Sequence, residues 1–141
     1  MSRYQSPLEM LAREPVLREI DARRHDDLAH AARIEPHWQD ARASVLLLPA
    51  AAWSRRVVGY LANQLANRQP QRAHALLLPA HAGGWRVSVR APLDAPGGAG
   101  ALCCRFGGSG RAAAGGIDQL PQADFERFIS TFGATQWGSF T

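Results

Sequence analysis

The sequence contains no lysine, so all sixteen of its basic residues are arginine. It has only two cysteines, and these are neighbours at positions 103 and 104. Adjacent cysteines rarely form a disulfide without strain, and no further ligands lie at a spacing that suits a metal site. We therefore expect Cys103 and Cys104 to be small core residues.

Long apolar runs are also missing. No run approaches the roughly 20 residues that a membrane-spanning helix needs, and residues 1–5 lack the apolar stretch of a signal peptide. These observations predict a cytoplasmic protein without a membrane partner. Hydrophobic residues make up 46% of the chain and charged residues 20%, a composition that can build a core and excludes a disordered polyelectrolyte.

The charge is distributed unevenly along the chain. Residues 1–40 contain six arginines and eight acidic residues, a net charge of −2. Residues 41–141 contain ten arginines and four acidic residues, a net charge of +6, which gives +4 for the whole chain. The excess of positive charge in the second part predicts an anion-binding surface there.

Apolar periodicity predicts the main elements of the fold. Residues 1–43 carry charged helical patterns, and we expect them to form a helical arm or linker, which leaves residues 44–141 as one domain. Within it we expect strands at 45–48, 74–78, 85–90 and 112–117, and helices at 54–67, 101–106 and 121–132. The strands at 74–78 and 85–90 should form an antiparallel hairpin, and strict alternation in the second places Arg86, Ser88 and Arg90 on one face. This order predicts the α/β class, with a small mixed sheet of about four to five strands flanked by helices.

The segment from Arg105 to Ile117 is unusually poor in side chains, with five glycines and three alanines. Backbone amides of such a segment can approach a ligand closely and can converge on one anion. Arg105 and Arg111 bracket the first glycines, so a phosphate there would lie in a positive field. The competing interpretation is a tight connection in which glycine serves only backbone conformation and packing.

Two motifs together carry a family resemblance. Ser88-Val89-Arg90 is followed after about fifteen residues by Arg-Phe-Gly-Gly-Ser-Gly-Arg-Ala-Ala-Ala-Gly-Gly. This pattern resembles the C-terminal, DHH-associated substrate-binding domain of the DHH phosphoesterase superfamily, which includes exopolyphosphatase-related proteins. The resemblance covers residues 44–135. It implies a phosphate and sugar site formed by the following residues: Ser88, Arg90, Gly107, Gly108, Ser109 and Gly110.

The chain departs from the family at the glycine motif. The family usually has Gly-Gly-Gly-His where this sequence has Gly-Gly-Ser-Gly, so Gly110 stands where the histidine would be and Ser109 replaces a glycine. We expect Arg111 to supply the lost ligand contact. This departure bears on the identity of the substrate.

The resemblance also implies a catalytic half that this sequence does not supply. In the family, Asp and His residues of that half bind two metal ions, usually manganese or magnesium. His25-Asp26-Asp27 is superficially similar to the family's signature, but it lies in a charged helical pattern, so we interpret it as a solvated helix face. We therefore assign no catalytic residue, metal ligand or cofactor to this chain, and we do not expect it to hydrolyse a substrate alone.

Three functional hypotheses follow. The first is the substrate-binding domain of a DHH-type phosphoesterase, with single-stranded nucleic acid, a short oligonucleotide or another phosphoester as ligand and a catalytic DHH domain as partner. The second is a non-catalytic interaction or regulatory module. The third is a coenzyme A-binding acyltransferase, because glycine-rich loops also bind pyrophosphate. A homodimer is left open.

Several other residues receive structural interpretations. We expect Arg55 and Arg56, near the start of a helix, to be solvated, and His74 and His81 to be structural or surface residues. Trp53 and Trp85 could stack on a base, but packing in or around the core is the preferred interpretation. No Ser/His/Asp set or Cys/His pair stands out for nucleophilic catalysis.

Overall fold

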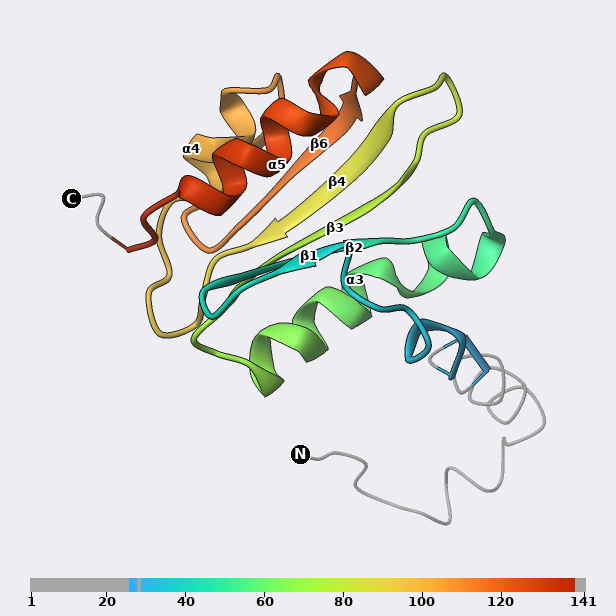
Figure 1. The fold of residues 1–141 in the computed structure, drawn as a ribbon, viewed down its shortest axis with the longest axis horizontal. Coiled ribbons are helices and arrows are strands. Elements are labelled where there is room, and N and C mark those ends of the chain that lie inside the picture. Colours follow the sequence, from blue (N-terminus) through green and yellow to red (C-terminus); the bar gives the residue numbers. More distant parts are fainter. Residues whose placement is uncertain (1–25, 28, 139–141) are drawn as a thin grey trace, which may run out of the picture.

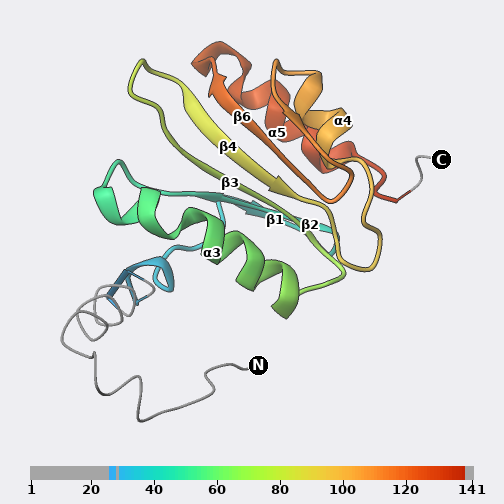
Figure 2. The same cartoon turned by 180° about the vertical axis from the view of Figure 1, so that it is seen from behind.

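The computed structural model describes residues 26, 27 and 29–138. Six strands form one mixed sheet that carries helices on both faces (Figures 1 and 2). The α/β class is confirmed, and the sheet has one strand more than the upper expectation. The elements in chain order are β1 (Trp38–Gln39), β2 (Ala43–Leu47), α3 (Ala52–Arg68), β3 (Ala73–Pro79), β4 (Trp85–Arg90), α4 (Ala99–Cys104), β5 (Ser109–Gly110), β6 (Ala114–Leu120), the 3₁₀ turn η1 (Gln122–Asp124) and α5 (Phe125–Ala134).

The strand order across the sheet is β1-β2-β3-β4-β6-β5. Strands β2 and β3 are parallel and are joined by α3, as a crossover connection requires. Every other neighbouring pair is antiparallel, including the predicted β3–β4 hairpin, whose turn contains Gly83 and Gly84 at φ values of 93° and 72°. The structure thus confirms both the mixed sheet and the hairpin.

Two hydrophobic clusters lie on opposite faces of the sheet. Successive side chains of a strand point to opposite faces, so Val45 of β2 belongs to one cluster and Leu46 to the other. Helices α4 and α5 cover the first face, which we call the closed face (Figure 1). Helix α3 packs on the second face over β3, through Val57 and Leu61. Continuous apolar runs in β2 and β3 are explained by this two-sided burial.

Aromatic side chains of α5 pack on the closed face against apolar residues of β2, β3, β4, β6 and α4. Phe125, Phe128 and Phe132 recur at helical spacing and are buried, with the last two fully inaccessible. Trp85 of β4 packs against Phe125 with ring centroids 5.2 Å apart, and its indole N–H donates to Gln122 Oε1 over 2.8 Å. The packing interpretation of Trp85 is therefore confirmed. Among the described helices, none has both the length and the apolar character that a membrane crossing needs.

The last residues of the expected arm dock against α3. Residues 26, 27 and 29–31 are helical, and Ala31 is buried in the cluster beneath α3. Asp27 is buried, and its two oxygens accept from Arg56 Nε and Nη2 over 2.8 and 2.9 Å. The expectation of a solvated helix face is therefore wrong at Asp27, because the carboxylate has a bidentate arginine partner. His25 lies outside the described residues.

The two cysteines differ in their environments. Cys103 is fully buried on the closed face, whereas Cys104 is exposed. Burial, with a smaller contribution from the neighbouring thiol, raises the pKa of Cys103 to about 11, so it remains a protonated, inert core residue. The core expectation is confirmed for Cys103 and wrong for Cys104, because the short helix α4 turns adjacent residues to different sides.

Candidate functional site

A row of polar side chains lies on the second face of the sheet, beyond the part that α3 covers. In β4, Val87 and Val89 point into the closed face, so the alternating Arg86, Ser88 and Arg90 point to the other side. We call these three residues the polar strip. Ser88 and Arg90 are half-buried and Arg86 is exposed. The sequence alternation predicted this common face, and the structure places it beside α3.

Strands β6 and β5 extend the same face. Gly116 of β6 lies directly opposite Ser88, and Ser109 of β5 lies directly opposite Gly116. Residues directly opposite one another share a face, so Ser88 and Ser109 are separated by two strand spacings, about 10 Å. The glycine between them leaves the backbone bare. The structure thus brings Ser88, Arg90 and Ser109 to one face, which we call the open face.

Arg90 is held by α3. Its Nε donates to Asn63 Oδ1 over 3.2 Å, and its Nη1 donates to Val89 O over 3.4 Å. Within the described residues it has no carboxylate partner, and Nη2 has no acceptor. Burial opposes the charge and lowers the pKa of Arg90. A partly desolvated guanidinium without a counter-ion is a favourable place for an external anion.

The first two glycines of the motif end helix α4. The Gly108 N–H donates to Cys103 O over 2.8 Å and the Gly107 N–H donates to Cys104 O over 3.2 Å, while Gly107 has a φ of 84°. This pair of bonds is the Schellman arrangement that closes many helices. The expectation that these two amides converge on an anion is therefore corrected, because both already donate within the fold.

Close backbone approach explains the other glycines. A Cβ on Gly108 would collide with Gly116 O, and one on Gly100 would lie 2.5 Å from Gly110 O. Gly110 has a φ of 153°, and a Cβ on Gly115 would meet Cys103 Sγ at 2.9 Å. Short strand β5 is thus pressed between β6 and the start of α4. Packing requires these glycines whether or not a ligand binds near them.

The two arginines that bracket the first glycines of the motif lie in different places, and neither belongs to the polar strip. Arg105 lies at the end of α4 and lines a cavity of about 300 Å³ with Ser130, Thr131 and Ala134 of α5 and with Thr135, which follows that helix. That cavity is on the side of α4 and α5, not on the open face. Arg111 is exposed in the turn between β5 and β6, and its N–H donates to Ala114 O over 2.7 Å.

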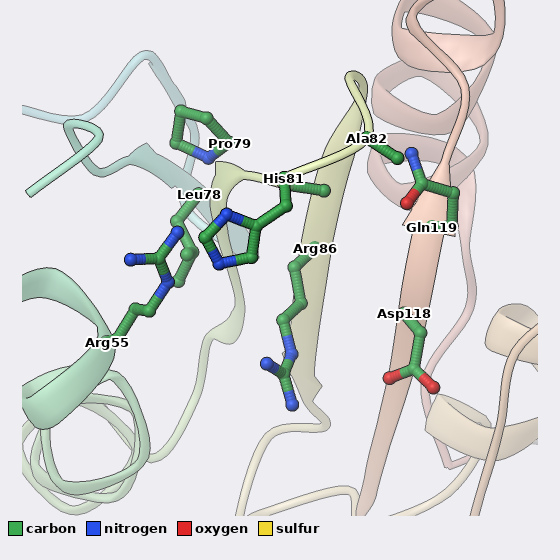
Figure 3. Close-up of a pocket in the computed structure, with 9 residues that line it drawn as sticks. Arg55, Leu78, Pro79, His81, Ala82, Arg86, Asp118 and Gln119 are labelled. Carbon is green, nitrogen blue, oxygen red and sulfur yellow. The ribbon is translucent and has the colours of Figure 1, made fainter. Parts of the chain in front are cut away.

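A second cavity, of about 380 Å³, lies at the start of β4. Figure 3 shows Arg55 reaching it from α3, His81 from the β3–β4 turn, Arg86 from β4 and Asp118 from β6. The sequence predicts a solvated Arg55 and a structural or surface role for His81, and it does not predict that the two line one cavity. Arg55 and His81 are far apart in the sequence, so no sequence pattern indicates that they meet. Only the crossover through α3 places Arg55 over the first residues of β4.

His74 lies beneath the C-terminal end of α3 and is fully buried. Within the described residues neither ring nitrogen makes a hydrogen bond of normal geometry, and burial is the main cause that lowers the pKa of this imidazole. It is opposite Arg90 in the sheet register. Its structural interpretation stands. In the described part of the chain, no three His, Cys, Asp or Glu side chains gather in a way that could hold a metal ion.

The fold and the open face define a class, an α/β domain that presents a polar sheet face beside one helix. Among solved structures, the chain is similar to the pGpG-specific phosphodiesterase PggH from Vibrio cholerae, with a TM-score of 0.61 and 14% sequence identity. The match covers 90% of this chain and 44% of that chain, so this chain spans less than half of the enzyme's length. At this identity the likeness shows a similar fold and nothing more. No family model and no curated protein matches the sequence.

Proposed function

We propose that this chain binds a nucleotide-type phosphoester, as the substrate-binding domain of a DHH-type phosphoesterase. The observation that carries the proposal is the half-buried Arg90 beside Ser88 on an otherwise bare part of the sheet. The similarity in fold to a phosphodiesterase and the Ser-x-Arg motif also support a phosphoester ligand. Residues 44–141 would form this domain, with its catalytic partner on a separate segment.

In this proposal the chain binds and orients the substrate. Arg90 donates to a phosphate oxygen from Nη2 while Asn63 holds its Nε, and the Ser88 hydroxyl donates to the same group. Gly116 and Ser109 border the site and let a sugar lie close to the backbone. The described residues gather no set that fits two metal ions. Manganese or magnesium would therefore belong to the catalytic half and would activate water there.

Titration with a short single-stranded oligonucleotide at several salt concentrations tests the proposal. We expect weak binding, about millimolar to micromolar, that falls steeply as salt rises, because counterions are released from the phosphates. Arg90→Gln should weaken binding about 10- to 100-fold, as expected for one lost charge-assisted contact. Arg127→Gln removes the same charge from α5 on the closed side and should leave the affinity within about twofold.

The main alternative is an interaction module whose ligand is a protein surface. An apolar interface would be insensitive to salt, and Arg90→Gln would then change oligonucleotide binding no more than Arg127→Gln. That result would exclude the phosphoester site. Metal-dependent hydrolysis by the pure 141-residue chain would contradict the proposal that substrate binding and catalysis belong to separate domains.

A further inference from the structure

The cavity of about 380 Å³ at the start of β4 combines charges of both signs. Arg55 of α3 and Arg86 of β4 bring two guanidinium groups to it, and Asp118 of the next strand, β6, brings a carboxylate (Figure 3). All three residues are exposed, so a ligand from solvent can reach them. Neither Ser88 nor Arg90 lines this cavity, which therefore lies outside the site of the proposed function.

An irregularity in the sheet explains why Asp118 reaches the cavity. The register of β4 against β6 shifts by one residue near the start of β4. Two residues of β6, Asp118 and Gln119, therefore lie opposite Arg86 alone, and both line the cavity. Bulges of this kind re-aim side chains and are common beside functional sites. The Gln119 side-chain amide donates to Gly83 O and is tied to the β3–β4 turn, which leaves the carboxylate of Asp118 available.

The charged groups of the cavity are close to one another and yet unpaired. Among the described residues, the side chains of Arg55, Arg86 and Asp118 form no ion pair and no hydrogen bond. Opposite charges on neighbouring strands commonly pair directly, and here they do not. A phosphate would satisfy the two guanidinium groups but would face the like charge of Asp118. A molecule with one carboxylate and one ammonium group satisfies both kinds of charge.

The rest of the lining is largely apolar. It consists of residues at the end of β3 and in the turn that follows, namely Leu78, Pro79, Ala80 and Ala82. An apolar wall with a few polar groups is typical of sites for small molecules. The volume is at the small end of the range for such sites, so the ligand should be about the size of one amino acid.

We propose that this cavity binds a free α-amino acid with an apolar side chain. Arg55 and Arg86 donate to its carboxylate, the group that guanidinium forks match best. The Asp118 carboxylate accepts from its ammonium group, and its side chain packs on Leu78 and Pro79. The site goes beyond the proposed function and does not depend on it, since the phosphoester residues take no part.

An amide NMR titration with three probes of similar shape tests the proposal. L-Leucine carries both charged groups, isocaproate lacks the ammonium group, and isoamylamine lacks the carboxylate. Leucine should bind with an affinity of about millimolar or better, and at least about tenfold more tightly than either analogue. Backbone amide signals of residues 80–86 and 118–119 should shift as leucine is added, and those of residues 128–134 in α5 should not.

Substitutions then assign each charge to its partner. Asp118→Asn should bring the affinities of leucine and isocaproate together, because the ammonium group no longer gains an ion pair. Arg86→Gln and Arg55→Gln should each weaken leucine about tenfold or more and reduce its advantage over isoamylamine. Asp94→Asn, at an exposed position past the other end of β4, and Arg127→Gln, in α5, are the matched controls. Both should leave all three affinities within about twofold.

The possible results separate this site from the phosphoester site. Equal affinity of leucine and isocaproate for the unaltered chain would overturn the proposal. So would leucine binding that survives both Asp118→Asn and Arg86→Gln in variants that circular dichroism shows to be folded. The absence of amide shifts at about 10 mM leucine would also overturn it and leave the proposed function untouched. Arg90→Gln should weaken the oligonucleotide and keep the leucine affinity within about twofold.

Discussion

The two faces of the sheet use the same strand in opposite ways. On the closed face, Val87 and Val89 of β4 are buried under the phenylalanines of α5. On the open face, Arg86, Ser88 and Arg90 lie beside α3, and Arg90 donates to Asn63 of that helix. One face therefore contributes apolar burial, and the other presents cationic and hydroxyl groups to solvent. A strand with strict alternation can thus serve stability and recognition at once, provided that only one face is fully covered.

This comparison implies that substitutions on the two faces have separable effects. A change in the closed face should alter the free energy of unfolding with little direct effect on ligand affinity. A change in the open face should do the reverse. The variants below measure the free energy of unfolding and complement the affinity variants described above, starting with the largest expected effect.

Phe128→Ala should reduce the free energy of unfolding by about 3–5 kcal/mol, the usual cost of deleting a fully buried aromatic side chain. Urea titration followed by circular dichroism measures this change. Leu93→Ala, at a position that is 48% exposed, is the control and should lie within about 0.5 kcal/mol of the unaltered chain. A loss below 1 kcal/mol at Phe128 would mean that the closed face does not carry the stability.

Gly108→Ala should cost about 1–3 kcal/mol, because the new methyl group would be forced against Gly116 O and Ile117 Cγ1. The same urea titration measures it. The substitution tests whether packing of β5 on β6 requires glycine in this part of the motif. A fully stable Gly108→Ala protein would contradict the close backbone approach that the structure shows.

Gly59→Ala makes the same chemical change as Gly108→Ala and should have the opposite sign. The added methyl group meets no atom within 4 Å and removes a helix-interior glycine, so stability should rise by about 0.5–1 kcal/mol. Thermal unfolding is a sufficient measurement. A decrease in the midpoint would show that the space beside Gly59 is needed by the fold itself.

The smallest expected effect concerns His74 and pH. Burial lowers its pKa below the ordinary value of 6.5, so the folded chain keeps this imidazole neutral at a pH where the unfolded chain protonates it. The unfolded state then binds more protons, and the free energy of unfolding should decrease as pH falls below about 6.5 and level off above it. His74→Leu should flatten this part of the profile, measured by urea titration from about pH 5 to 7.5.

The exposed His81 provides the control for this profile. His81→Gln changes a histidine that is outside the core, so the slope below pH 6.5 should be kept. A His74→Leu variant with the original slope would mean that another group causes the dependence.

Most of the fold could be predicted from sequence because its signals are local. The apolar runs of β2 and β3, the alternation of β4 and the spacing of Phe125, Phe128 and Phe132 each specify an element without reference to the rest of the chain. Strands β1 and β5 were missed because two residues carry no periodic signal. Their pairing depends on neighbours that only the folded chain supplies.

The candidate site was predictable only in part. Alternation placed Ser88 and Arg90 on one face, but the positions of Arg55 and Asn63 beside that face depend on how α3 lies against β4. The composition singled out the glycine segment. It could not distinguish a turn that ends a helix from a loop whose backbone amides bind an anion. The buried Asp27 was missed because its partner, Arg56, is 29 positions away.

The brevity of the outermost strands has a consequence for behaviour at high concentration. The outermost strands of the sheet, Trp38–Gln39 and Ser109–Gly110, are each only two residues long. Such stubs make poor templates for the stacking of chains into fibres. The protein can therefore expose a polar sheet face at high concentration, because its edge strands pair poorly with the sheets of other molecules.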